Sequence, residues 1–265
     1  MKRLLAGLLA GVTVMGLTAC GAPAAKSAVQ AGKLSATVDG TTTLTETSVQ
    51  NAAQWIGRTP KYVFLFIGDG MSYPQFQAAS DYLGAVADPD YMQAEPSVKD
   101  RQGAVLDGPK ELNFMNFDVA GSAVTYDSCS FAPDSASTAT SIATGHKTYS
   151  GMINTDETGT VAYETIAEKL HAQKGWKVGV ISSVNLNHAT PAAFYAHQAS
   201  RNNYYEIGQE LVESSFEYFA GGALKKPTGN NKDQTSLYDL AEEAGYKVTY
   251  TQADAAKVTA KDKKV

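Results

Sequence analysis

The segment from Lys61 to Ile67 constrains the fold of this chain more than any other part of the sequence. After the lysine, Tyr-Val-Phe-Leu-Phe-Ile forms an unbroken apolar run. Such a run is typical of a central parallel strand that is covered on both faces. The run ends at Gly68-Asp69-Gly70, and loops at the carboxyl ends of strands hold the ligands in open α/β sheets. We therefore expect Asp69 to lie in a functional loop at the edge of a parallel sheet.

Strand and helix patterns alternate along the rest of the chain, without internal repeats. Helices are predicted near 74–83, 161–173, 190–201, 204–214 and 236–244, and further strands near 121–126, 176–182 and 246–250. This alternation predicts an α/β fold with a mainly parallel central sheet flanked by helices.

The N-terminus carries an export signal. Lys2 and Arg3 precede an apolar run that stops at Leu17-Thr18-Ala19-Cys20. The run is too short and wrongly flanked for a membrane-spanning helix, so we interpret residues 1–19 as a signal peptide. The last four residues look like a bacterial lipobox, in which Cys20 is lipidated; the alternative is a plain signal peptide with an incidental cysteine. Residues 20–57, rich in Ala, Gly, Ser and Thr, are interpreted as the lipidated N-terminus and a flexible tether, and 58–265 as the folded domain.

Charge and cysteine content limit the partners of the chain. The formal net charge is −5, with no basic stripe for nucleic acid. Membrane contact is expected through the lipid alone, which predicts an exported protein anchored in the bacterial cell envelope. Cys129 is the only cysteine besides Cys20, and we expect it to be at least partly buried.

The segment 133–145 predicts a short helix with a serine at its start. Pro133 and Asp134 are helix start signals, and Gly145 is a stop signal. Ser135 would then face the unpaired N–H groups and the positive dipole end of the helix, a setting suited to a phosphate. Taken alone, the motif is better explained as an ordinary Asp/Ser cap.

Three motifs in order make the sequence resemble the N-terminal half of alkaline phosphatase, over roughly 61–201. They are Phe66-Ile-Gly-Asp-Gly-Met71, the run from Pro133-Asp-Ser-Ala-Ser-Thr-Ala-Thr140 to Gly145-His-Lys-Thr-Tyr-Ser-Gly151, and Asn187-His-Ala-Thr-Pro-Ala-Ala193 with Ala196-His-Gln-Ala-Ser-Arg201. The resemblance implies an incomplete form of that family's three-layer α/β sandwich.

The resemblance also implies a phosphomonoesterase with two zinc ions and one magnesium ion. Ser135 would attack phosphorus and form a phosphoserine, since a serine hydroxyl needs a metal or a base to become a good nucleophile. Asp69 matches the aspartate that bridges the second zinc and the magnesium, and Ser135 would also contact that zinc. Thr190 matches a hydroxyl ligand of magnesium, although it could equally be a helix N-cap.

Arg201 matches the arginine that clamps the phosphate, and Asp134 the acid that orients it. Without the resemblance, Arg201 would be interpreted as a solvated charge at a helix end. His188 stands where one well-known bacterial pattern has an aspartate, and other branches of the family also have histidine there. We therefore place His188 beside the magnesium ligands rather than among them.

The chain has no histidine after His197. In the family, the remaining zinc ligands come from Asp and His motifs in the C-terminal half. We therefore expect 58–265 to be the N-terminal portion of such a domain with the C-terminal half missing, and the 265 residues alone to hydrolyse phosphomonoesters little or not at all. A homodimer is a possible assembly.

Several other functions are compatible with parts of this pattern. A phosphodiesterase or phosphonate hydrolase of the same superfamily stays open. A sulfatase would need a Cys/Ser-x-Pro-x-Arg signature, which Cys129-Ser-Phe-Ala-Pro lacks, and a serine esterase would need a Gly-x-Ser-x-Gly elbow. The alternative from another class is a lipid-anchored, degenerate protein that keeps a weak anion site.

Overall fold

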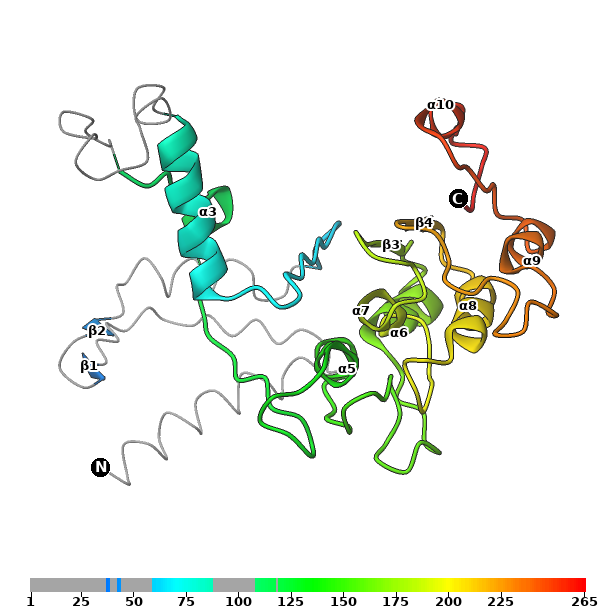
Figure 1. Ribbon diagram of the computed structural model, residues 1–265, viewed down its shortest axis with the longest axis horizontal. Coiled ribbons are helices and arrows are strands. Elements are labelled where there is room, and N and C mark those ends of the chain that lie inside the picture. The colour runs from blue at the N-terminus through cyan, green and yellow to red at the C-terminus, as the bar shows by residue number, and fades with distance from the viewer. Residues whose placement is uncertain (1–36, 39–41, 44–58, 88–107, 118) are drawn as a thin grey trace, which may run out of the picture. The chain divides into compact units, whose positions relative to one another are not determined.

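The computed structural model describes residues 37–38, 42–43, 59–87, 108–117 and 119–265 (Figure 1). The internal contacts of the chain divide it into two units. The first is Met1–Ile67 and the second Gly68–Val265. In the first, β1 (Thr37–Val38) pairs antiparallel with β2 (Thr42–Thr43), inside the predicted tether. The predicted signal peptide and Cys20 lie outside the described residues.

The predicted central strand at 61–67 is wrong. These residues form no strand, and Tyr62, Phe64 and Phe66 are 68%, 78% and 86% exposed. A strand needs a neighbour to take up its backbone hydrogen bonds and to cover its side chains. No strand in the described part of the chain pairs with 61–67. The strands predicted near 121–126 and 246–250, both within the described ranges, are absent as well, and Val124 is 78% exposed.

Parallel pairing occurs between β3 (Gly179–Ile181) and β4 (Tyr218–Ala220). Val180 lies opposite Phe219 in this register. β3 is the central part of the strand predicted at 176–182, whereas β4 has no counterpart among the predictions. Two parallel strands require a crossover connection, and here it carries two helices, α7 (Ala189–Ala192) and α8 (Tyr204–Glu213). The predicted α/β class is confirmed.

The remaining helices precede β3 or follow β4 along the chain. They are α3 (Tyr73–Val86), the 3-10 helix η1 (Asn113–Asn116), α5 (Ser135–Thr144), α6 (Ile166–Lys174), α9 (Leu237–Glu243) and α10 (Gln252–Ala255). α3, α5, α8 and α9 lie where helices were predicted, and α6 begins later than predicted because Thr165 caps it. None of the helices in the described ranges is long and apolar enough to cross a membrane.

The helix predicted at 190–201 is wrong in both length and start. α7 has four residues, its N-cap is His188 rather than Thr190, and Pro191 lies within its first turn. The helix ends early because a side chain from another segment hydrogen-bonds to the backbone carbonyls that follow α7. Asn154 Nδ2 donates to the carbonyls of Ala193 and Ala196, both at 2.8 Å. Gln198 then pairs antiparallel with Ile153.

α5 is built from small residues with a capped start and a glycine end. Its N-cap, Asp134, accepts from the amide of Ser137 at 3.1 Å, and Gly145 ends it with φ 77°, a conformation suited to glycine. The hydroxyls of Ser135, Ser137 and Thr140 contact neighbouring segments; for example, Thr140 Oγ1 accepts from the amide of Asn154 at 2.9 Å. The other hydroxyls of α5 donate to carbonyls one turn earlier. These contacts account for Ser and Thr residues that favour a helix only weakly by themselves.

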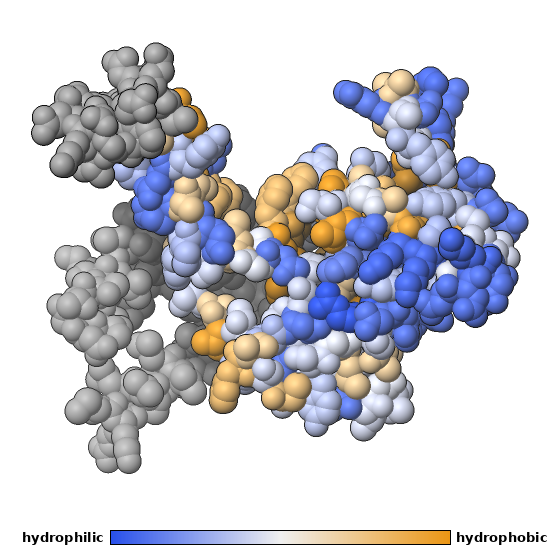
Figure 2. All heavy atoms as spheres, viewed as in Figure 1, coloured by the Kyte–Doolittle hydropathy of each residue, from blue (hydrophilic) through white to orange (hydrophobic). Residues whose placement is uncertain are grey.

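The core packs α5, α7, α8 and the β3–β4 pair together. Its fully buried members include Ala136, Ile153, Ala192, Ile207 and Phe216. Hydrophobic residues also remain on the surface where β3 and β4 lie (Figure 2), and Ile181 is 73% exposed. Cys129 is exposed, contrary to prediction, because it lies in a bend whose amides point at the side chain of Asp127.

Candidate active site

Asp69 holds two hydroxyl groups from distant parts of the sequence. Its Oδ1 accepts from Ser135 Oγ at 3.0 Å and its Oδ2 from Thr190 Oγ1 at 2.7 Å. Ser135 is the first residue of α5, and Thr190 belongs to α7, which packs against α5. The structure thus brings together the three residues that the sequence singled out as metal-linked.

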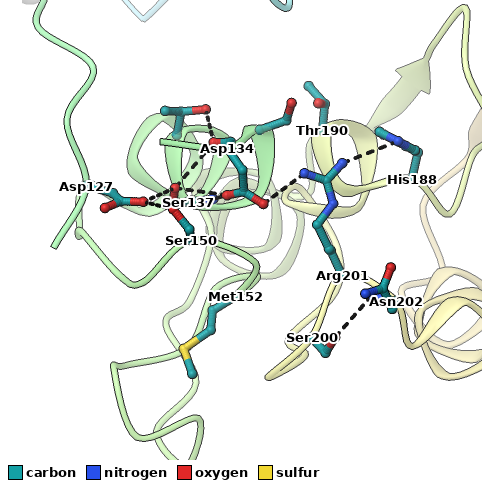
Figure 3. Close-up of polar contacts among 12 residues, drawn as sticks. Asp127, Asp134, Ser137, Ser150, Met152, His188, Thr190, Ser200, Arg201 and Asn202 are labelled. Carbon is teal, nitrogen blue, oxygen red and sulfur yellow. Dashed lines mark hydrogen bonds and ion pairs between the residues drawn. The ribbon is translucent and has the colours of Figure 1, made fainter. Parts of the chain in front are cut away.

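Asp134 and Arg201 form the second contact of the site. Arg201 Nη1 lies 2.8 Å from Asp134 Oδ2, with both side chains about a quarter exposed (Figure 3). Burial raises the pKa of Asp134, but hydrogen bonds from Arg201, from the amide of Gly151 and from Ser137 outweigh it and lower that pKa. The carboxylate therefore stays ionised and holds the guanidinium at the residue that precedes Ser135.

His188 contacts the other side of the same guanidinium. Its Nε2 lies 3.3 Å from Arg201 Nη2. Arginine has no acceptor, so Nε2 must accept, and the neutral ring then carries its proton on Nδ1. Burial, followed by the charge of Arg201, lowers the pKa of His188, which favours that neutral form. Nδ1 is buried and has no hydrogen-bond partner among the described residues.

Arg201 keeps donors free for an anion. A guanidinium has five N–H donors in a planar fork, and the two contacts just described engage one hydrogen on each terminal nitrogen. The remaining N–H groups can bind two oxygens of one phosphate.

Three residues that the sequence analysis did not single out adjoin this site (Figure 3). Asp127 is 4% exposed and accepts from the hydroxyls of Ser137 and Ser150. Ser137 Oγ is also 3.1 Å from Asp134 Oδ1. In the sequence, the signal for Asp127 was an acidic residue shortly before the Pro-Asp-Ser motif, and that signal is weak by itself.

The other histidines contact glutamate or tyrosine side chains away from the candidate site. His197 lies between Glu168 and Glu210, at 3.3 and 3.5 Å. His146 stacks on Tyr163 with ring centroids 4.3 Å apart, and His171 lies 3.5 Å from Glu217. None of them contacts Asp69, Ser135 or Arg201.

The donor set fits magnesium better than zinc. Asp69 and Thr190 offer oxygen donors, which magnesium prefers. Zinc sites need three or four protein ligands, and Asp69 and Ser135 supply two. The described residues hold no group of three or more His, Cys, Asp or Glu side chains that could bind a metal. Asp69 and Ser135 thus supply fewer donors than a stable zinc site needs.

A cavity of about 560 Å³ lies elsewhere, between β4 and the segment after α9. Leu186, Phe219, Tyr246 and Tyr250 contribute to its largely apolar lining. Asp69, Ser135, Thr190 and Arg201 do not line it, so it is separate from the candidate active site.

Comparison with known proteins identifies the class to which this fold and site belong. The sequence pattern of the family described as alkaline phosphatase matches residues 60–226. Alkaline phosphatase 4 of Bacillus subtilis is 29% identical over 198 residues, which cover 72% of this chain and 38% of that protein. The tissue-nonspecific alkaline phosphatase of Gallus gallus is 30% identical over 189 residues, covering 62% of this chain and 33% of that protein.

The fold is also similar to that of a solved alkaline phosphatase structure. The cold-active alkaline phosphatase of a psychrophilic Shewanella species superposes with a TM-score of 0.54 at 27% identity, covering 73% of this chain and 42% of that one. The chain belongs to the alkaline phosphatase family. It spans about two fifths of the length of the Bacillus and Shewanella proteins.

Proposed function

We propose that this chain carries the nucleophile and the phosphate clamp of a phosphomonoesterase. Ser135 is the nucleophile, Arg201 binds the phosphate, and Asp134 and His188 orient Arg201. The observation that carries this proposal is the position of one arginine, ion-paired to the residue before Ser135 and still holding free donors. Its substrates are phosphomonoesters.

The chemistry follows from the contacts of Ser135. Its hydroxyl donates to Asp69 Oδ1, so the proton is already directed at a carboxylate oxygen. Attack forms a bond between Ser135 Oγ and phosphorus, and the hydroxyl proton passes by way of Asp69 Oδ1 to solvent. The bond from phosphorus to the alcohol oxygen of the substrate breaks, and that oxygen leaves with a proton from solvent. The product is a phosphoserine, which water hydrolyses to inorganic phosphate and free serine.

Arg201 contributes by binding and orientation. Its free N–H groups neutralise charge on two phosphate oxygens, and the N-terminus of α5 adds its partial positive charge. Because Asp134 and His188 hold the fork from two sides, little side-chain entropy remains to be lost when phosphate binds.

Magnesium would be held by Asp69 and Thr190 in this proposal. When bound, such an ion supplies fixed positive charge that favours ionisation of a nearby hydroxyl and stabilises phosphoryl oxygens. His188 adjoins the same residues and stays neutral, so it does not repel a cation. We propose further that the protein is exported and anchored to the membrane by lipid on Cys20.

Titration with inorganic phosphate tests the phosphate clamp. Isothermal calorimetry of the full chain with magnesium should detect binding, and Arg201→Ala should weaken it about tenfold or more because a charge-assisted bidentate contact is lost. Ser135→Ala serves as the matched control and should bind within about threefold of the unaltered protein, since its hydroxyl adds a single neutral hydrogen bond at most. Equal affinity of the Arg201 variant and the unaltered protein would overturn the assignment.

The second candidate is a phosphate-binding protein without catalysis. It is favoured by one observation: no cluster of zinc donors exists among the described residues. The two functions share the clamp, and they differ in whether phosphate becomes covalently attached to Ser135.

A further inference from the structure

Asp127 lies outside the contacts assigned to binding and chemistry, yet it is among the most buried charged groups of the described residues. It is 4% exposed, and both of its oxygens are occupied. Oδ1 accepts from the amides of Cys129 at 2.9 Å and Ser130 at 2.7 Å. Oδ2 accepts from the hydroxyls of Ser137, at 2.8 Å, and Ser150. A buried carboxylate with four donors is ionised and rigid.

The first connection from Asp127 leads to the start of α5. The hydroxyl of Ser137 lies 2.8 Å from Asp127 Oδ2 and 3.1 Å from Asp134 Oδ1, so it bridges two carboxylates. The amide of Ser137 donates to Asp134 as well. Asp127 thereby fixes the side chain of the residue that both caps α5 and holds Arg201.

The second connection leads to the backbone of Arg201. Ser150, held by Asp127, is followed by Gly151, whose carbonyl accepts from the amide of Arg201 at 2.7 Å. The amide of Gly151 also contacts the Asp134 carboxylate. Two residues further on, Ile153 and Gln198 exchange both backbone hydrogen bonds at 2.9 Å. The segment from Ser150 to Ile153 therefore supports the segment that ends at Arg201.

These two connections converge on one ion pair. We propose that Asp127 is a positioning residue that sets the geometry of Arg201 and Asp134, through Ser137 on one side and Ser150–Gly151 on the other. The effect on phosphate affinity rests on the proposed function, whereas the effect on the geometry of Arg201 does not. Asp127 itself touches neither phosphate nor Ser135 Oγ.

Asp127→Asn is the most informative substitution. An asparagine has almost the same shape, but only one of its two terminal atoms accepts hydrogen bonds. It cannot receive both the backbone amides and the two serine hydroxyls in their present arrangement. Ser150→Ala is the milder second variant, because it cuts only the connection to Gly151, and Asp156→Asn is the matched control at an exposed aspartate that also accepts backbone amides.

Nitrogen-15 NMR of the arginine side chains measures the geometry directly. The chain has four arginines, at positions 3, 58, 101 and 201, so the signal of Arg201 can be assigned with Arg201→Lys. In protein without phosphate, we expect the Arg201 guanidinium signal to shift and its N–H exchange to quicken in Asp127→Asn and Ser150→Ala. Asp156→Asn should leave both unchanged. A merely structural role of Asp127 would alter stability without moving this signal.

Phosphate titration of the same variants then links geometry to binding. Asp127→Asn and Ser150→Ala each remove at least one hydrogen bond to the segment that supports Arg201. We therefore expect the affinity for phosphate to fall about fivefold in each variant. An unchanged Arg201 signal in folded Asp127→Asn and Ser150→Ala proteins would overturn the inference. Failure of the unaltered protein to bind phosphate would instead count against the proposed function, while the NMR comparison would still decide the role of Asp127. If Asp127→Asn does not fold, the Arg201 signal of Ser150→Ala alone decides between the two outcomes.

Discussion

Asp134 and Arg201 lie 67 positions apart in sequence and form a contact of 2.8 Å between Oδ2 and Nη1. The same aspartate caps α5 through its other oxygen. One side chain therefore joins the start of a helix to Arg201, for which we propose phosphate binding. Different substitutions of Asp134 can therefore separate its role as helix cap from its ion pair with Arg201.

Asp134→Asn should cost less stability than Asp134→Ala. Asparagine is as good an N-cap as aspartate, whereas alanine cannot accept from the amide of Ser137. We expect the free energy of unfolding in urea to be lower by about 1 kcal/mol more for the alanine variant. Equal losses for the two variants would show that the cap contributes nothing and that the ion pair alone matters.

Thr190→Val should weaken magnesium binding by about tenfold, because the methyl group that replaces the hydroxyl can neither coordinate nor orient Asp69. Thr190→Ser keeps the hydroxyl and should bind magnesium nearly as well as the unaltered protein. Calorimetric titration with magnesium chloride compares the three proteins. Indistinguishable affinities would remove Thr190 from the proposed site.

His197 should make stability depend on pH at the alkaline end. Burial lowers the pKa of His197, but Glu168 and Glu210 outweigh it and raise that pKa to about 10, from an ordinary value of 6.5. The folded protein therefore holds a proton that the unfolded chain releases. The resulting stability is complete below about pH 6.5 and is lost as the pH rises towards 10.

Urea unfolding at several pH values measures this effect. After allowance for solvent screening, the unaltered protein should lose about 1–2 kcal/mol from this source between pH 6.5 and 10. His197→Gln should flatten that slope, and His171→Gln, which removes a histidine beside a single carboxylate, should not. Parallel pH profiles for all three proteins would contradict the account.

The sequence predicted those parts of the site that depend on local signals. The Pro-Asp-Ser start and the glycine end of α5 follow from capping chemistry within a few residues, and the structure has them where predicted. The run 61–67 is different, because a strand depends on neighbours that local hydrophobicity cannot report. Its side chains are apolar enough for a core, but in the described ranges its backbone pairs with no strand.

The contacts of α7 and Asp127 could not be predicted for a related reason. Thr190-Pro191 is a good local cap, yet Asn154 takes the carbonyls of Ala193 and Ala196 and ends the helix early. Asp127 acquires its role only when Ser137 and Ser150 fold onto it. In both cases tertiary hydrogen bonds decide, and nothing in the neighbouring residues indicates them.

The most direct test of the proposed function is to look for phosphate bound covalently to Ser135. The purified chain is incubated with an aryl phosphate and magnesium, quenched in acid and mapped by mass spectrometry. We predict phosphoserine at position 135, absent in Ser135→Ala and retained in Ser141→Ala, which removes another hydroxyl of α5. Phosphate binding without any phosphoserine at Ser135 would contradict this account and identify a phosphate-binding protein instead.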